Sequence, residues 1–121
     1  MKIIYTSSAP EPVGPYSQAI LSENTLYCSG QIGINPETGV LSDGIENQTE
    51  QIMKNISEVL KQAGFNFENV VKTTCFLNDM KDFSKFNEIY AKYFISKPAR
   101  SCVQAKLPKG ALAEVEIIAI K

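Results

Sequence analysis

One face of residues 45–63 is apolar, and this stretch constrains the fold more than any other feature of the sequence. Its apolar side chains recur every three or four residues, which is the spacing of one side of an α-helix. Gly64 follows the last of them, and glycine is common where a helix ends. Because such a helix must bury its apolar face, we expect it to pack on another layer of secondary structure.

The remaining segments predict that this layer is a β-sheet. Residues 70–77 are rich in β-branched side chains, which favours a strand. A second helix is expected from Asp79 or Asp82 to about Phe94, and we interpret its aromatic stripe as core packing. The expected strands are residues 2–6, 16–21, 25–32, 70–77, 99–106 and 113–120. This order predicts one α+β domain over residues 1–121, with two helices packed on one face of a single mixed sheet.

Side chains alternate between the two faces of a strand, which assigns each candidate residue to a face. In the strand over 99–106, Arg100 and Cys102 lie on the face opposite Ala99 and the other small side chains. Small side chains suit packing beneath helices, so we expect Arg100 and Cys102 on the uncovered face. The same alternation places Tyr27 and Gln31 together on one face of their strand.

The uncovered face of the sheet is expected to mix charged and apolar groups. Glu114 and Glu116 share one face of the last strand, and Ile118 and Ile120 continue that face as an apolar surface. Phe76 adds a further apolar group. Apolar side chains on a face that no helix covers favour burial against another subunit. We therefore expect a homo-oligomer with the polar groups near its subunit boundary.

Composition restricts the chemistry and the location. The chain has no histidine, three widely spaced cysteines and a formal net charge of -1. This excludes the common zinc sites and the catalytic dyads that use histidine. The charge gives little support for binding to nucleic acid or to a membrane surface. No apolar run reaches the roughly 20 residues that cross a bilayer, and the N-terminus lacks the features of a signal peptide. We therefore expect a cytoplasmic protein.

Arg100 is the only arginine, and the other eleven positive side chains are lysine. A guanidinium is a planar fork that binds a carboxylate through two parallel hydrogen bonds, which an ammonium group does not offer. Composition alone leaves two interpretations open: Arg100 binds a carboxylate of a substrate, or it forms a structural ion pair.

Five separated motifs are similar to those of one protein family. They are G-P-Y-S-Q-A at 14–19, S-G-Q-I at 29–32, P-A-R-S-C-V at 98–103, L-P-K-G-A at 107–111 and E-V-E at 114–116. In this order they span nearly the whole chain and resemble the Rid family, the YjgF-type reactive intermediate deaminases. The resemblance implies a chorismate-mutase-like fold, a homotrimer with three clefts between subunits, and no cofactor or metal.

The resemblance also implies an activity and a site. The family hydrolyses 2-aminoacrylate and related 2-imino acids, such as 2-iminobutanoate and 2-iminopropanoate, to 2-keto acids and ammonia. By this resemblance Arg100 binds the substrate carboxylate, and Glu114 orients the attacking water. Cys102 lines the site, with its backbone carbonyl near the substrate nitrogen. The remaining cleft residues implied by the family are Tyr16, Ser29, Gly30 and Asn87, some of them from a neighbouring subunit.

Three assignments remain open at this point. Glu114 and Glu116 share a face, so alternation does not separate them, and we favour Glu114 as the group that orients water. Cys102 could be a nucleophile, but without a histidine we favour a side chain that shapes the pocket. The main alternative function is a non-catalytic regulator that binds 2-keto acids. An RNA-cleaving inhibitor of translation is less favoured, because the chain lacks a basic stripe and a histidine.

Overall fold

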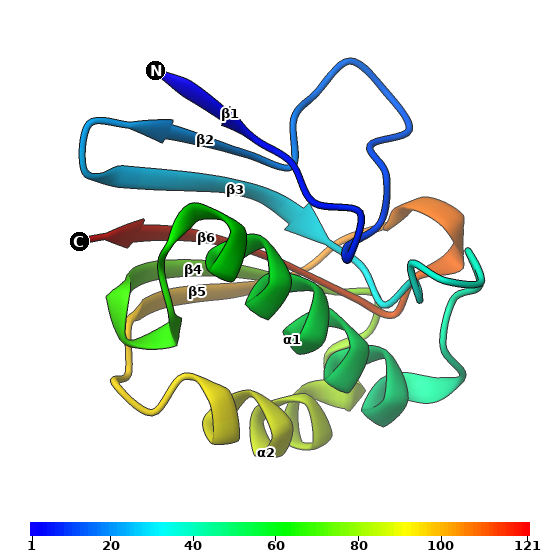
Figure 1. Ribbon diagram of the computed structural model, residues 1–121. Helices are drawn as coiled ribbons and strands as arrows, with labels where there is room; N and C mark the ends of the chain where they lie inside the picture. The colour runs from blue at the N-terminus through cyan, green and yellow to red at the C-terminus, as the bar shows by residue number, and fades with distance from the viewer.

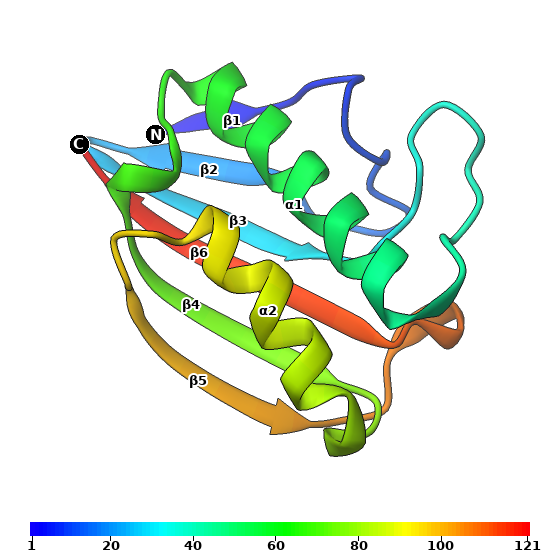
Figure 2. The same ribbon diagram turned by 90° about the horizontal axis from the view of Figure 1, so that it is seen from below.

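The computed structural model covers residues 1–121 and contains one six-stranded sheet with two helices on the same face (Figures 1 and 2). This confirms the predicted α+β class. The main elements are β1 (Lys2–Ile4), β2 (Ala19–Ser22), β3 (Thr25–Gln31), α1 (Gly44–Ala63), β4 (Val70–Leu77), α2 (Phe83–Tyr93), β5 (Ala99–Gln104) and β6 (Ala113–Ile120). Three short 3₁₀ turns, η1 (Phe67–Asn69), η2 (Met80–Asp82) and η3 (Pro108–Gly110), connect them.

The strand order in the sheet is β1-β2-β3-β6-β4-β5. Only β4 and β5 are parallel to each other, and every other neighbouring pair is antiparallel, so the sheet is mixed as expected. The last strand of the chain therefore lies in the middle of the sheet, between β3 and β4 (Figure 2). This topology brings the start of β6 beside the end of β3, so the motif at 114–116 lies next to the motif at 29–32.

Helix α1 agrees closely with the predicted amphipathic stretch. Ile52, Met53 and Ile56 on its apolar face are 2% exposed or less and belong to the hydrophobic core. Gly64 ends the helix with a φ of 81°, and its N–H donates to the carbonyls of Leu60 and Lys61. A left-handed residue without a Cβ is well suited to this position, so local sequence was sufficient to define the helix and its end.

Helix α2 contributes the expected aromatic layer to the core. Phe86, Tyr90 and Phe94 are all buried, which confirms that the aromatic stripe is core packing. The Tyr90 hydroxyl is not left unpaired, because it lies 2.7 Å from the hydroxyl of Thr73 on β4. Burial raises the pKa of this phenol, so it stays protonated near neutral pH.

The prediction that Arg100 lies on the uncovered face of the sheet was wrong. Arg100 and Cys102 point toward α2, whereas Ala99, Ser101 and Val103 are exposed on the uncovered face. Because β5 is an edge strand, its small side chains do not need to pack beneath helices. The longer aliphatic stem of arginine can instead lie along the aromatic side chains while its charged end reaches the solvent.

A β-bulge at the end of β3 breaks the expected alternation. The register of β3 on β6 shifts between Cys28 and Gln31. Tyr27 remains half exposed, but Gln31 is only 7% exposed, so these two side chains do not share an environment. One extra residue in a strand reverses the faces of all residues that follow it.

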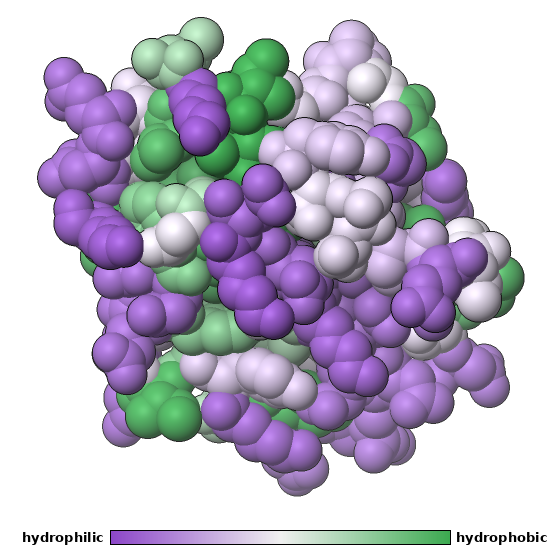
Figure 3. All heavy atoms as spheres, viewed as in Figure 1, coloured by the Kyte–Doolittle hydropathy of each residue, from purple (hydrophilic) through white to green (hydrophobic).

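The uncovered face of the sheet carries apolar side chains, as expected. Tyr27, Val103 and Ile120 on this face are each close to half exposed. Figure 3 also shows hydrophobic side chains gathered over the N-terminal strands, on a surface that is otherwise largely hydrophilic. Neither α1 nor α2 combines the length and apolar character that crossing a membrane requires.

Candidate active site

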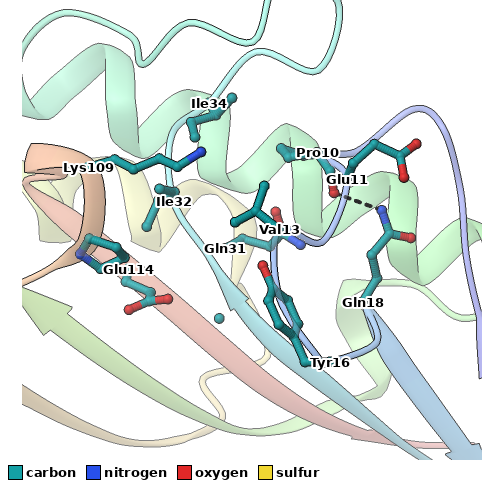
Figure 4. A pocket seen from close by; sticks show the side chains of 12 residues that line it. Pro10, Glu11, Val13, Tyr16, Gln18, Gln31, Ile32, Ile34, Lys109 and Glu114 are labelled. Atoms are coloured by element: carbon teal, nitrogen blue, oxygen red, sulfur yellow. Dashed lines mark hydrogen bonds between the residues drawn. The ribbon is translucent and has the colours of Figure 1, made fainter.

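A small cavity lies where β3 ends and β6 begins, beneath the loop that precedes β2. Its volume is about 90 Å³. We call it the Glu114 cavity, and Figure 4 shows the side chains that converge on it. Its polar lining residues are Glu11, Tyr16, Gln18, Gln31, Lys109 and Glu114.

The Glu114 carboxyl group lies directly against Gly30. A Cβ at position 30 would be 2.5 Å from Oε2 of Glu114 and 2.8 Å from its Cδ, which is closer than any real contact. Only glycine at position 30 leaves the carboxylate where it is, because any Cβ there would push the Glu114 side chain away. Gly30 is not in the left-handed region, so this close approach, and not the backbone conformation, explains the residue.

The environment separates the two glutamates that alternation left equivalent. Glu114 is partly buried and lines the cavity, whereas Glu116 is exposed and does not. Burial raises the pKa of Glu114 above its usual 4.5, and the negative charge of Glu116 raises it further. A carboxylate with a raised pKa is a better proton acceptor than an ordinary surface carboxylate.

The loop over residues 7–16 is held by one buried side chain, Gln18. The Gln18 carboxamide accepts a hydrogen bond from the N–H of Thr6 at 2.8 Å and donates to the carbonyls of Thr6 and Pro10, both at 3.0 Å. This loop brings the half-exposed ring of Tyr16 to the cavity (Figure 4). The hydroxyl of Ser29 donates to the carbonyl of Ser17 at 2.6 Å. Ser29 therefore supports the loop and is not among the residues that line the cavity.

Helix α1 fixes the opposite wall of the cavity through two buried amide side chains. Asn55 donates to the carbonyls of Ile32 and Ile34, and Gln48 accepts from the N–H of Leu112 just before β6. Gly33 lies so close to α1 that a Cβ there would be 2.7 Å from the backbone of Gln48. The loop after β3 and the start of β6 are thus both attached to one rigid helix.

Arg100 occupies a second location, between β5 and α2. Its Nη1 donates to Oδ1 of Asn87 at 2.7 Å. The guanidinium carbon lies 4.7 Å from the ring centre of Tyr90 and 5.5 Å from that of Phe83. Aromatic faces attract and orient a guanidinium group. Because the Asn87 side chain is a neutral amide, it does not compensate the positive charge of Arg100. The adjacent surface groove, which we call the Arg100 groove, has a volume of about 440 Å³ and is lined by Arg100, Asn87 and Lys97 among others.

Cys102 packs beside the core and has little of the character of a nucleophile. It is partly buried and pairs in the sheet with Cys75 on β4. Burial raises the pKa of the Cys102 thiol, and the Arg100 charge only partly opposes this. Because the thiolate is the reactive form, a raised pKa argues against a nucleophile, and Cys102 lines neither the Glu114 cavity nor the Arg100 groove. No group of three or more cysteine, aspartate or glutamate side chains converges as a metal site would require.

The candidate residues therefore form two groups within one chain. Tyr16, Gly30 and Glu114 meet at the Glu114 cavity, and Arg100 and Asn87 lie together beside α2. Glu114 is on the uncovered face of the sheet, and the strand β4 separates β6 from β5. Arg100 is on the opposite, helix-covered face. A single copy of the chain does not bring the two groups together.

The family model described as endoribonuclease L-PSP matches residues 6–121. This match covers nearly the entire chain and includes both groups of candidate residues. The chain belongs to this family, the Rid family.

Two curated relatives of this Rid protein carry different functional names. The human 2-iminobutanoate/2-iminopropanoate deaminase is 50% identical over 123 residues, which cover 99% of this chain and 90% of the human protein. A Lactococcus lactis protein named as a proposed regulator, AldR, is 54% identical over 122 residues, which cover 98% of this chain and 97% of that protein.

The fold of this Rid protein matches that of a crystal structure with a ligand. E. coli TdcF with bound serine superposes with a TM-score of 0.96 at 35% sequence identity. The match covers 100% of this chain and 99% of TdcF. The expected Rid fold is therefore confirmed over the full length of the chain.

One residue that lines the Glu114 cavity, Gln31, was given no role from the sequence. Gln31 lies in a motif that pointed to the family, but strict alternation assigned it to the wrong face and no role was given to it. The glycine that precedes it was the available signal, because a glycine inside a strand often marks a bulge.

Proposed function

We propose that this protein is an imine deaminase that hydrolyses 2-iminobutanoate, 2-iminopropanoate and the related 2-aminoacrylate to 2-keto acids and ammonia. The observation that carries the proposal is that the chain holds both an oriented guanidinium without a carboxylate partner and, on the other face of the sheet, a partly buried carboxylate that lies against Gly30. The identity with the human deaminase supports the same activity. Such a reaction needs neither a covalent nucleophile nor histidine, because the imine carbon is already electrophilic.

Arg100 binds the substrate carboxylate in this mechanism. Asn87 uses one N–H of the guanidinium and leaves the remaining donors for a ligand. The stacked rings of Tyr90 and Phe83 restrict rotation of the side chain, so less conformational entropy is lost when a carboxylate binds. The serine bound to TdcF is an amino acid with the same carboxylate, which supports this ligand class.

Glu114 orients water for attack on the imine carbon. As the water oxygen bonds to carbon, one water proton passes to the Glu114 carboxylate, and the C=N electron pair moves to nitrogen, which then takes up that proton from Glu114. The proton of the carbinolamine hydroxyl group next passes through Glu114 to the amino group, the C–N bond breaks as the C=O bond forms, and ammonia leaves. Tyr16 is available to assist proton transfer from the same cavity. Positioning of water and substrate lowers the barrier by roughly several kcal/mol.

The separation of Arg100 from Glu114 supports a site shared between subunits. Within one chain these groups lie on opposite faces of the sheet. A cleft between two copies can combine the Arg100 of one with the Glu114 of the other, and the apolar side chains of the uncovered face supply an interface. We therefore include a homotrimer with three such clefts in the proposal.

A non-catalytic regulator is the second candidate function, because AldR carries a regulator's name at 54% identity. Such a protein could use the same Arg100 groove to bind a 2-keto acid without turnover. The family's endoribonuclease description suggests RNA cleavage, for which the chain offers neither histidine nor an excess of positive charge.

One coupled assay separates these functions. A dehydratase generates 2-aminoacrylate from serine or 2-iminobutanoate from threonine, and release of 2-keto acid is followed with and without the protein. We expect a faster release with wild-type protein and near-complete loss of the effect in Arg100→Lys, which keeps the charge but not the fork. No acceleration by a protein whose melting temperature is raised by 2-ketobutyrate would instead indicate the regulator. Cleavage of RNA by the same preparation would indicate the nuclease.

A further inference from the structure

Lys97 has a left-handed backbone conformation, which is unusual for a residue with a side chain. Only three residues other than glycine have a positive φ: Glu23, Lys97 and Lys109. Glu23 lies in the hairpin turn between β2 and β3, where positive φ values are common. Lys97 lies instead in the connection from α2 to β5 (Figure 2), with a φ of 56° that a Cβ disfavours. Backbone strain of this kind is often retained for a function.

A turn after α2 holds Lys97 at the Arg100 groove. The N–H of Lys97 donates to the carbonyl of Phe94 at 3.1 Å and closes this turn. Pro98 follows, and its ring restricts the backbone where the chain enters β5. Because Lys97 precedes Arg100 by only three residues, their Cα atoms are at most about 11 Å apart. Both residues line the groove, so one ligand in it is within reach of both side chains.

The charged side chains of the Arg100 groove are all positive. Its lining includes Lys97 and Arg100 but no aspartate or glutamate. The two ion pairs of the chain involve other lysines, so Lys97 has no carboxylate partner. Ala91, Phe94 and Ile95 give the groove an apolar wall, and Ile95 is 77% exposed. Two unpaired cations beside an apolar wall suit a ligand whose two negative groups are joined by methylenes.

We infer that Lys97 binds a second carboxylate, so that the site accepts 2-imino acids with an acidic side chain, an inference that rests on the proposed function. Arg100 holds the carboxylate next to the imine carbon, as in the proposed mechanism. The Lys97 ammonium group pairs with the carboxylate at the far end of the substrate, and the methylenes between them lie along the apolar wall. The reaction is unchanged: water adds to the imine carbon, and a dicarboxylic 2-keto acid and ammonia leave.

This role gives the binding preference a salt dependence. Lys97 is exposed, so its attraction for a carboxylate is weakened by dissolved ions. The preference for dicarboxylic ligands should therefore shrink between about 0.1 M and about 1 M salt, as the Debye length falls from roughly 10 Å to roughly 3 Å. A lysine that only shapes the turn would give no such preference at any salt concentration.

The test measures binding of 2-oxoglutarate and 2-ketobutyrate to wild type, Lys97→Gln and Lys92→Gln by titration calorimetry. Only 2-oxoglutarate carries a second carboxylate. Lys92 is a matched control, because it is an exposed lysine in the last turn of α2 that does not line the groove. We expect wild type and Lys92→Gln to bind 2-oxoglutarate about fivefold more tightly than 2-ketobutyrate. Lys97→Gln should lose this preference and bind 2-ketobutyrate as wild type does.

Turnover and stability supply two further readouts. An amino-acid oxidase generates the imine of glutamate or of 2-aminobutyrate, and release of keto acid is followed with and without the protein. Lys97→Gln should raise KM about fivefold for the glutamate imine at unchanged kcat, and leave both constants unchanged for the other imine. Lys97→Asn should lose the same preference with an unchanged or higher melting temperature, because asparagine tolerates a left-handed φ.

Two results would overturn the inference. One is a wild-type protein that binds 2-oxoglutarate no more tightly than 2-ketobutyrate. The other is an equal loss of preference in Lys92→Gln and Lys97→Gln, which would assign the preference to the general positive charge of this region.

The two kinds of measurement keep this inference separate from the proposed function. If wild type hydrolyses neither imine but prefers 2-oxoglutarate in a way that depends on Lys97, the deaminase proposal fails and the assigned ligand class stands. If wild type hydrolyses both imines and Lys97→Gln alters neither KM, the inference fails alone.

Discussion

Gly30→Ala is a direct perturbation of the Glu114 carboxylate. The new Cβ would lie 2.5 Å from Oε2 of Glu114, whereas ordinary contacts begin at 3.4 Å. The carboxylate must therefore retreat by about 0.9 Å. Because a misplacement of about 1 Å can cost roughly 100-fold in rate, we expect kcat to fall about 100-fold. Gly30 has no left-handed φ, so alanine adds no backbone strain of that kind.

The coupled dehydratase assay measures this loss, and two other glycines provide controls. In Gly33→Ala the Cβ meets the backbone of Gln48 at 2.7 Å, so we expect a lower melting temperature. In Gly14→Ala the nearest atom is 3.5 Å away, in the ring of Tyr16, so activity and stability should stay near wild type. A folded Gly30→Ala protein with full activity would refute the assignment of Glu114 to the reacting water.

Three further variants test the electrostatics of the two groups. Asn87→Asp should raise KM more than tenfold, because the new carboxylate pairs with Arg100 and competes with the substrate; an unchanged KM in steady-state kinetics would contradict this. Glu116→Gln should move the acidic limb of the kcat/KM–pH profile to lower pH. It removes a charge that raises the pKa of Glu114, so the water-orienting carboxylate stays ionised in more acidic solution. Cys102→Ser should retain most activity, because the raised pKa of this thiol does not suit a nucleophile; inactivity in a folded variant would restore that role.

The sequence predicted those parts of the fold that depend on local patterns. Helix α1 begins within one residue of the expected position, because its apolar spacing and Gly64 are both local signals. Strand β6 matches its expected limits, and its inward side chains are the apolar ones. The family motifs also named residues that the fold brings together, such as Gly30 and Glu114.

The errors arose where tertiary context decides. Alternation separates the side chains on the two faces of β5, but it does not say which face α2 covers. Because β5 is an edge strand, Arg100 lies on the helix-covered face and not on the uncovered face that was expected. The bulge before Gln31 reversed a second assignment. The 2.5 Å approach between Gly30 and Glu114 depends on β6 returning beside β3, which joins residues that are far apart in the sequence.

Mixing two inactive variants tests the central claim, that Arg100 of one subunit and Glu114 of another hydrolyse an imine together. Arg100→Ala and Glu114→Ala should each be folded and inactive in the coupled assay. When their subunits are mixed equally, about a quarter of the clefts combine an intact Arg100 with an intact Glu114. We therefore expect about a quarter of wild-type activity to return. Mixed oligomers, verified by native mass spectrometry, that remain inactive would contradict the shared site.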